Sequence, residues 1–429
     1  MPASAPPAVS FGEAFRFWLR LGFISFGGPA GQIAIMHQEL VERRRWISES
    51  RFLHALNYCM VLPGPEATQL ATYIGWLMHR TWGGIVSGGL FVLPSVFILI
   101  ALSWIYVAYG DVTLIAGIFY GIKPAVVAVV LAAAHRIATR ALRHPALWIV
   151  ATAAFCAIFF FDTPFPLIVI AAGLLGYLGG RVAPDVFATG PGHGAASAAY
   201  GPALIDDGSP LPPHTRFSWP KLWAYSLGGV ALWALAMGML LALLGWQHTL
   251  TQMGWFFTKT ALLTFGGAYA VLPYVFQNTV EHYHWLTAPQ MIDGLALGET
   301  TPGPLIMVVA FVGFLGAGTA GALVATFFTF LPSFVFIFAG APFIETTHGN
   351  LRFTAPLTGI TAAVVGVIVN LALFFAYHVL WPQGFAARFD FVSALIGVAA
   401  LVALFRYKAG IIPVIAACAV AGLAVRVFT

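Results

Sequence analysis

Long apolar segments separated by short polar ones dominate this chain. A helix needs about 20 apolar residues to cross a bilayer. Five windows reach that length: Gly84–Ala108, Leu114–Ala134, Leu222–Leu244, Gly318–Gly340 and Ala355–Ala376. Two further stretches divide into pairs of shorter spans: Ala146–Phe161 with Phe165–Leu178, and Phe391–Phe405 with Gly410–Val425. The pattern predicts an all-α polytopic membrane protein.

The composition excludes a soluble globular protein. Apolar residues make up 60% of the chain and charged residues 8%, against roughly 25% charged residues in soluble domains. Cys59, Cys156 and Cys418 lie in apolar surroundings without metal-ligand spacing, so we interpret them as core residues. The net charge of +5 reflects orientation in the membrane rather than nucleic-acid binding. We expect no metal, no cofactor and no nucleic acid, and membrane lipid as a partner.

Two Gly/Pro motifs occur twice at a constant spacing. Phe26-Gly27-Gly28 recurs 239 residues later as Phe265-Gly266-Gly267, and Pro63-Gly64-Pro65 recurs at the same spacing as Pro302-Gly303-Pro304. Further on the spacing is 238, where Gly121-Ile122 matches Gly359-Ile360. The chain therefore contains two copies of one unit. In an apolar chain, paired segments interrupted by Gly and Pro indicate the binding site of a transporter.

Arginine and lysine indicate that the two copies face opposite ways, because cytoplasmic loops carry an excess of these residues. The loop 43–51 holds four arginines and its equivalent, 276–290, holds none. The bias reverses later: the turn at Asp162 has none, whereas its counterpart has Arg406 and Lys408. We predict an N-terminal repeat (1–181), a cytoplasmic linker with one inverting transmembrane helix (182–249), and an inverted C-terminal repeat (250–429).

The Pro-Gly-Pro segments have to satisfy the same topology. If the arginine-rich loops 43–51 and 136–143 are both cytoplasmic, the chain between them crosses an even number of times. Gly84–Ala108 and Leu114–Ala134 supply two crossings, so Phe52–Arg80 should enter the membrane and return, as two half-helices that meet at Pro63-Gly64-Pro65. Irregular backbone at this depth is tolerated only against protein or water. A single straight crossing is the open alternative.

Helix ends at these breaks offer free N–H groups and partial positive charge, which suit an anion. The helix-breaking prolines are Pro63, Pro65, Pro302 and Pro304. The predicted donors at the breaks are Ser25, Gly27, Gly28, Gly64, Thr264, Gly266, Gly267 and Gly303, with the flanking polar residues Asn57, Thr68, Gln69, Thr300 and Thr301. The alternative is that the glycines allow close helix packing and that the polar side chains only satisfy loose carbonyl groups.

Few charges lie within the apolar segments, so each is a functional candidate. Arg20 and Lys259 occupy equivalent positions before the two Phe-Gly-Gly breaks. Such a pair of cations would suit a dianion, although Arg20 could instead extend to the membrane interface. Glu66 and Glu299 lie beside the two Pro-Gly-Pro motifs and are not equivalent. They are candidate proton carriers, counter-ions or helix caps.

At these residues the chain resembles the chromate ion transporter family in its long, two-domain form. The resemblance rests on four motifs and covers nearly the whole chain outside the linker: FGGPAGQIAIMH (26–37), LPGPEATQLATYIGW (62–76), TFGGAYAVLPY (264–274) and GETTPGPLIMVVAFVGF (298–314). Gly298 is the one departure, where an alanine-like residue is expected. The resemblance implies two homologous halves of opposite topology in a multi-pass plasma-membrane protein. It also implies export of chromate and competition by sulfate.

Two other function classes remain as alternatives. A general carrier of sulfate or another tetrahedral oxyanion would need the same donors and charges as a chromate carrier. An intramembrane enzyme would need a nucleophile and a base clustered in one half, and the duplicated motifs argue against that. We therefore expect a secondary transporter that is not an enzyme and that works by alternating access. A homodimer is an open possibility for its assembly.

Overall fold

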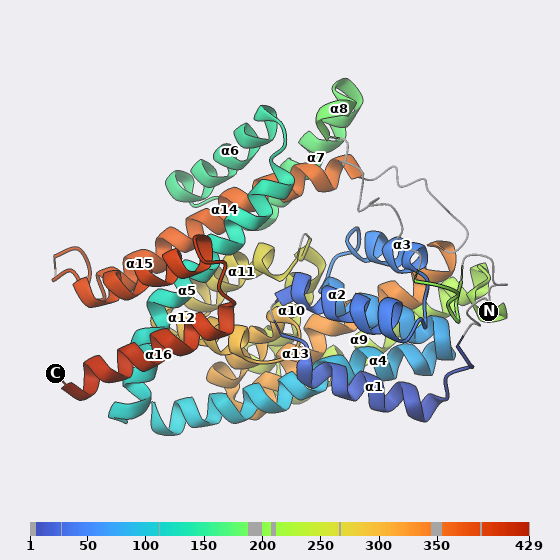
Figure 1. The fold of residues 1–429 in the computed structure, drawn as a ribbon, viewed down its shortest axis with the longest axis horizontal. Coiled ribbons are helices and arrows are strands. Elements are labelled where there is room, and N and C mark those ends of the chain that lie inside the picture. Colours follow the sequence, from blue (N-terminus) through green and yellow to red (C-terminus); the bar gives the residue numbers. More distant parts are fainter. Residues whose placement is uncertain are drawn as a thin grey trace.

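The computed structural model shows that the protein is a bundle of helices (Figure 1). The structure describes residues 6–26, 28–110, 112–187, 200–206, 212–265, 267–344, 354–386 and 388–428. Across these residues the only β-structure is an isolated bridge between Ile47 and Ile205. Seven described helices are long and apolar enough to span a membrane. The predicted all-α polytopic fold is confirmed.

The first half of the chain forms a helix wherever an apolar window was predicted. Its elements are α1 (Phe11–Ile24), α2 (Gly28–His37), the π-helix η1 (Gln38–Arg43), α3 (Glu49–Cys59), α4 (Glu66–Tyr109), α5 (Thr113–Ala141), α6 (Pro145–Phe161) and α7 (Phe165–Val182). The short helices α8 (Pro184–Phe187) and η2 (Pro213–Thr215) follow, and then α9 (Trp219–Leu244). Helix α9 corresponds to the helix that was predicted between the repeats.

The second half repeats this order. Its elements are α10 (Thr249–Leu263), α11 (Ala268–Phe276), the π-helix η3 (Gln277–His282), α12 (Ala288–Thr300), η4 (Leu305–Met307), α13 (Val308–Ile344), α14 (Thr354–Leu380), α15 (Phe391–Phe405) and α16 (Ile411–Phe428). The two π-helices begin and end 239 residues apart. After each, the backbone turns through a left-handed residue, Arg45 (φ 51°) or His284 (φ 54°). The repeat in sequence is thus also a repeat in local backbone geometry.

Helix α4 is a helical hairpin rather than one straight rod. Its backbone leaves the helical conformation at His79 and Arg80, and the parts on either side pack against each other. The Ser87 hydroxyl donates to the carbonyl oxygen of Ala71 at 2.7 Å, and Gly75 touches Gly83. Helix α13 has the same break at Ala317 and Gly318. Helix α3 and the first part of α4 therefore lie on either side of Pro63-Gly64-Pro65, and the path of this segment into the membrane and back stays a prediction.

The helices form two bundles, and each bundle takes elements from both halves of the chain. We call α1–α4 with α10–α13 the motif bundle, because it carries all four Gly/Pro breaks. We call α5–α7 with α14–α16 the flanking bundle. Within the motif bundle α4 packs on α13 and on α1, and within the flanking bundle α5 packs on α14, α15 and α16. Figure 1 shows the flanking bundle to the left of, and above, the motif bundle.

The segment between the halves is attached to the motif bundle. The described part of the linker runs beside the turn after η1, where the N–H of Ile205 donates to the carbonyl oxygen of Trp46 at 3.1 Å. Further on, the ring of His214 donates to the carbonyl oxygen of Trp76 at 2.9 Å. Helix α9 then packs on α13 and α10 with most of its apolar side chains exposed.

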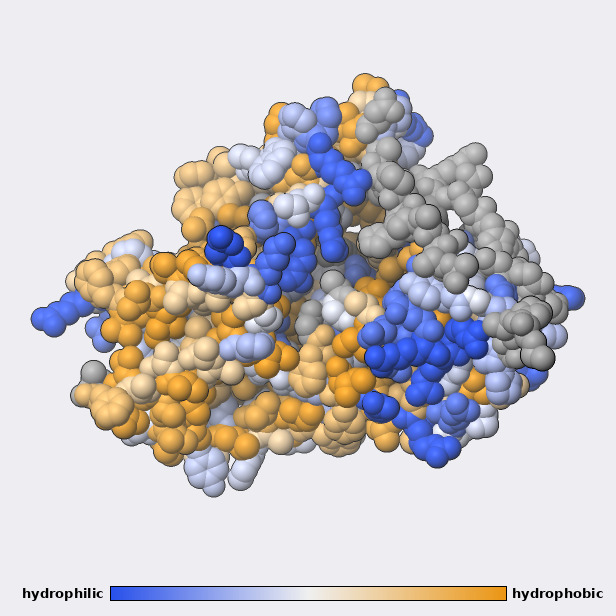
Figure 2. Space-filling view, in the orientation of Figure 1, coloured by the Kyte–Doolittle hydropathy of each residue, from blue (hydrophilic) through white to orange (hydrophobic). Residues whose placement is uncertain are grey.

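The surface agrees with a protein surrounded by lipid. Apolar side chains cover much of the face in Figure 2 over α4, α15 and α16, whereas polar side chains gather over α2 and the neighbouring η1. Exposed apolar residues on α9 include Trp223, Leu235 and Leu243. Each would be costly in water, and each suits contact with acyl chains.

Candidate functional site: the crossing of the four breaks

Two reciprocal hydrogen bonds bring the four breaks together. The N–H of Gly64 donates to the carbonyl oxygen of Thr264 at 2.7 Å, and the N–H of Gly303 donates to the carbonyl oxygen of Ser25 at 2.7 Å. These two pairs are related by the repeat spacing of 239. A contact from i to j matched by its equivalent from j to i is the signature of an approximate two-fold axis. The breaks therefore meet at one place inside the motif bundle, where Gly64 contacts Thr264 and Gly303 contacts Ser25. We call this place the crossing.

Glycine is required at the centre of both Pro-Gly-Pro turns. Gly64 (φ 124°) and Gly303 (φ 104°) have backbone angles that side chains rarely permit. A Cβ atom on Gly64 would collide with the Ser333 hydroxyl, and one on Gly303 would collide with the Ser95 hydroxyl. Ser95 donates from that hydroxyl to the carbonyl oxygen of Pro302. Each turn thus lies against a long helix of the other half.

Two helices begin at the crossing without a side-chain cap. Helix α4 starts at Glu66 after Pro65, and α11 starts at Ala268 after Gly267, and neither has a capping side chain. Uncapped first-turn N–H groups carry the positive end of the helix dipole. The half-buried Glu66 carboxylate reaches α11, since its Oε1 lies 4.0 Å from where a Cβ on Gly267 would stand. The positive ends of two helices and one carboxylate therefore share this space.

Glu299 is the second carboxylate at the crossing. It lies at the end of α12, is 6% exposed, and accepts a hydrogen bond from the Tyr269 hydroxyl in the first turn of α11. Its other oxygen, Oε2, is buried without a partner in the described structure. Arg136 of α5 is close enough to interact with the charge of Glu299. Glu66 and Glu299 are not equivalent in sequence, yet both approach the N-terminus of α11.

The polar residues predicted near the Pro-Gly-Pro motifs divide into two groups. Thr68 and Gln69 are buried at the start of α4, and Thr68 Oγ1 and Gln69 Oε1 have no hydrogen-bond partner in the part of the chain that the structure describes. By contrast, Thr300 and Thr301 donate to carbonyl groups of their own helix, and Asn57 is exposed on α3. Within this set, Thr68 and Gln69 are therefore the buried side chains whose oxygen atoms could still form a hydrogen bond to a ligand at the crossing.

The hydroxyl groups of Ser25 and Thr264 are also engaged. They donate to the carbonyl oxygens of Leu21 and Thr260, each at 2.7 Å. Gly28 is the first residue of α2 and has a left-handed backbone (φ 68°). Gly27 and Gly266, predicted as donors, lie outside the described residues.

Arg20 and Lys259 make no described contact with the crossing. Arg20 is exposed on the same face of α1 as Arg16, with Phe23 and Leu19 beside it. Lys259 is half-buried, with its ammonium group 5.9 Å from the centre of the Trp255 ring. This placement favours the interfacial alternative for Arg20, because a cation at a helix surface extends toward lipid headgroups.

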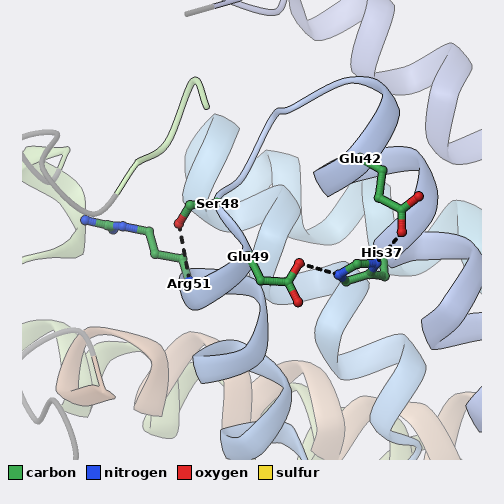
Figure 3. A network of polar contacts seen from close by, with 5 residues as sticks. All are labelled: His37, Glu42, Ser48, Glu49 and Arg51. Atoms are coloured by element: carbon green, nitrogen blue, oxygen red, sulfur yellow. Dashed lines mark hydrogen bonds and ion pairs between the residues drawn. The ribbon is translucent and has the colours of Figure 1, made fainter. Parts of the chain in front are cut away.

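A polar network closes the outer end of α2. The ring of His37 lies between two carboxylates, 2.5 Å from Glu49 Oε2 and 3.2 Å from Glu42 Oε1 (Figure 3). Beside it, the N–H of Arg51 donates to the Ser48 hydroxyl, which caps α3. The network joins α2, η1 and α3, and so fixes the chain between the two breaks of the first half.

Sequence reasoning missed three residues at the crossing. Gln32 of α2 donates to the carbonyl oxygen of Gly303, and its Oε1 is buried without a described partner. Tyr269 donates to the Glu299 carboxylate, whereas Arg136 is exposed and interacts with it only through its charge. Gln32 and Tyr269 lie within motifs quoted for the family resemblance, and a polar residue inside an apolar helix was the available signal. Arg136 was used only as a marker of topology.

Comparison with known proteins places the whole chain in one family. The family model described as chromate transporter matches residues 12–177 and 251–423, which leaves out the linker and α9. A chromate transport protein of Pseudomonas aeruginosa is 34% identical over 368 residues, covering 85% of this chain and 81% of that protein. One of Cupriavidus metallidurans is 30% identical over 404 residues, covering 94% and 90%.

A probable chromate transport protein of Synechococcus elongatus is 28% identical over 402 residues, covering 93% of this chain and 91% of that protein. No solved structure matches the chain significantly. The two regions of the family match, each containing one Phe-Gly-Gly and one Pro-Gly-Pro break, agree with the long, two-domain form. The chain is therefore a multi-pass membrane protein that belongs to the chromate transporter family.

Proposed function

We propose that this protein exports chromate from the cytoplasm across the plasma membrane. The observation that carries the proposal is the crossing itself, where the reciprocal bonds of Gly64 and Gly303 bring two uncapped helix N-termini together between apolar helices. Backbone N–H groups at helix N-termini bind oxyanions in many proteins. The relatives named as chromate transport proteins supply the identity of the anion.

The membrane potential favours export over uptake. A dianion that leaves an inside-negative cell gains roughly 2 × 2.3 kcal/mol per 100 mV. Export against a modest gradient can therefore run on the potential alone, whereas uptake would have to overcome the same term. Exchange with a proton or another anion would add to the driving force.

We further propose that the two bundles are the bodies that move during alternating access. The halves of the chain are interleaved, because α4 packs on α13 and α5 packs on α14. Rocking of one half against the other would break both of these interfaces. Movement of the motif bundle along the flanking bundle preserves them, and carries the crossing from one side of the membrane to the other.

Glu66 and Glu299 are the groups that would couple transport to protons. When charged, each carboxylate neutralises the positive end of α11 and repels a dianion. When protonated, each leaves the helix end free for chromate. Protons would then promote binding of the dianion, which makes both residues candidate carriers of a proton that leaves together with chromate. The membrane potential would then act on one net charge instead of two, so this coupling differs from proton exchange, and the imposed pH gradient distinguishes the two. Thr68, Gln69 and Gln32 would supply further hydrogen bonds to the oxyanion, and Arg136 would supply a positive charge that acts on the same space as Glu299.

The test is uptake of radiolabelled chromate into inverted membrane vesicles that contain the protein. A membrane potential and a pH gradient are imposed separately, with vesicles containing Gly303→Ala protein as the inactive control. Saturable accumulation driven by either gradient supports export and names the driving force. Flux of sulfate without flux of chromate would instead identify a general oxyanion carrier, and no flux of either dianion would refute the proposal.

A further inference from the structure

A buried polar cluster lies outside the crossing, on α12, α5 and α4. The carboxylate of Asp293 is 2% exposed, and its Oδ2 accepts a hydrogen bond of 2.9 Å from the Tyr106 hydroxyl. The Lys123 ammonium lies 3.4 Å from the same oxygen. The other oxygen, Oδ1, is buried with no partner among the described residues. A charged pair at such depth in apolar helices is costly and calls for a functional reason.

This ion pair joins the two bundles. Asp293 is on α12 of the motif bundle, and Lys123 is on α5 of the flanking bundle, against which α12 packs. Helix α12 lies beside α5, to the left of the centre of Figure 1. Asp293 is also only six residues before Glu299 on the same helix. Any movement of the motif bundle along the flanking bundle on this side must therefore separate Lys123 from Asp293.

The equivalent place in the other half has no such pair. The repeat puts Thr361 of α14 where Lys123 stands, and His54 of α3 where Asp293 stands. The Thr361 hydroxyl donates to the carbonyl oxygen of Leu357 in its own helix. Helix α3 packs on α4, whereas α12 also packs on α5, α14 and α16. Because Thr361 carries no charge, the ion pair of Lys123 with Asp293 is not repeated between these two equivalent positions.

Helix α12 and its repeat equivalent, α3, differ in how far their side chains are exposed. Ala296 of α12 is 1% exposed, whereas its repeat equivalent Asn57 of α3 is exposed. Glu299 is 6% exposed, whereas its equivalent Met60 is 49% exposed. Helix α12 is therefore buried where its repeat equivalent α3 is exposed, which is the asymmetry expected if the α12 side is the closed one. The inter-bundle ion pair lies on this buried side.

We propose that Lys123 and Asp293 form a gate that holds the α12 side closed and opens in each transport cycle. The proposal rests on the alternating access proposed above. Removing either partner leaves an uncompensated charge in the closed interface, and so favours the state in which the remaining group reaches water.

The test measures which side is accessible, without any transported anion. Cys59, Cys156 and Cys418 are replaced by alanine, and a single cysteine is placed at Ala296 or, in a second protein, at Asn57. Rates of labelling by a soluble maleimide are measured on full-length protein in nanodiscs, where both faces meet the reagent. The gate variants are Lys123→Met, Asp293→Asn and the exchanged pair Lys123→Asp with Asp293→Lys. Thr361→Val is the matched control at the equivalent position.

Each single gate variant should raise the labelling rate at Ala296→Cys by about tenfold, a typical coupling between distant sites, and lower it at Asn57→Cys. The exchanged pair, which restores opposite charges, should return both rates toward those of the parent, and Thr361→Val should change neither. Unchanged labelling at Ala296→Cys in both single variants would overturn the gate, as would an exchanged pair that labels like the singles. Absence of chromate flux with these shifts present would refute the proposed substrate and leave the gate standing.

Discussion

The backbone N–H of Gly64 donates to the carbonyl oxygen of Thr264 at 2.7 Å, so the turn of one half caps the broken helix of the other. Thr264 ends α10, whose last carbonyl groups would otherwise lack partners. The reciprocal bond from Gly303 to Ser25 does the same for α1. Neither half can complete its own break, and the candidate site exists only when both halves are folded together.

Substituting Gly64 or Gly303 by alanine should therefore abolish transport and destabilise the protein. A side chain at positive φ costs about 1–2 kcal/mol. The added Cβ also collides with Ser333 or Ser95, which should force apart the hydrogen bonds to Thr264 or Ser25. We expect a lower Tm for the purified protein and no chromate uptake by vesicles.

The matched control is Gly89→Ala on α4. A Cβ there meets no atom within 4 Å, and alanine is the better helix former by up to about 1 kcal/mol. Its Tm should equal or exceed that of the parent. If Gly64→Ala and Gly89→Ala behaved alike, the two Pro-Gly-Pro turns would not depend on close approach between the halves.

The helices and the repeat could be predicted from sequence, because they depend on local patterns. The length of the apolar windows predicted the long helices, and the repeated spacing of the Gly and Pro motifs predicted the paired breaks. Which way a side chain faces within a fully apolar bundle could not be predicted, since such helices have no polar face to mark the outside. Helix α1 is an exception, because Glu13, Arg16 and Arg20 recur on one face of it, away from most of its buried residues. Arg20 was expected to point inward and lies exposed, and this spacing was the available signal. The pairing of Lys123 with Asp293 depends on α12 packing against α5, which no local pattern encodes.

Glu299→Gln should tighten binding of chromate and flatten its dependence on pH. The carboxylate beside the N-terminus of α11 repels a dianion when charged, and glutamine keeps the acceptor for Tyr269 without the charge. We expect about tenfold higher affinity at alkaline pH, equivalent to about 1.4 kcal/mol. The measurement is equilibrium binding of radiolabelled chromate over pH values at which it stays a dianion.

Glu66→Gln should act in the same direction, because Glu66 reaches the same helix end. Glu39→Gln is the control, since that carboxylate pairs with Arg43 in η1, away from the crossing. An unchanged pH profile in both Glu66→Gln and Glu299→Gln would exclude these carboxylates as proton carriers.

Arg136→Gln should weaken chromate binding, and Arg20→Gln should not. Both arginines are exposed, but Arg136 is close enough to interact with the charge of Glu299, whereas Arg20 makes no described contact with the crossing. Loss of one cation near a bound dianion lowers affinity by about tenfold, or about 1.4 kcal/mol. Binding measured on both variants and on Lys259→Gln tests the paired-cation prediction directly. Strong losses in Arg20→Gln and Lys259→Gln with none in Arg136→Gln would restore that pair as the binding cations.

The attachment of the linker should weaken in acid. Burial lowers the pKa of His214 below its ordinary value of 6.5, and the nearby charges of Arg80 and Lys221 act in the same direction. The unfolded chain therefore binds a proton more readily than the folded chain as the pH falls. The stability due to neutral His214 is present above pH 6.5 and is lost below it. Between about pH 7.5 and about pH 5.5, the parent should lose more Tm than His214→Gln, whose amide still donates to Trp76. Equal losses of Tm in the parent and in His214→Gln would show that His214 does not contribute to the loss of stability in acid.

If the two repeats have opposite orientations, as the arginine bias predicts, the ends of the chain have defined sides of the membrane. The arginine-rich loop 43–51 and the linker belong on the cytoplasmic side, and the crossing made by α9 then reverses every later element. A reporter fused after Thr429 should therefore be active outside the cell, and the same reporter inserted between residues 191 and 192 should be active inside. A third fusion within residues 43–51 should agree with the linker fusion. If the reporters at the linker and after Thr429 gave the same side, α9 would not be an inverting crossing. The approximate two-fold axis that relates Gly64 to Gly303 would then have to lie in some direction other than the membrane plane.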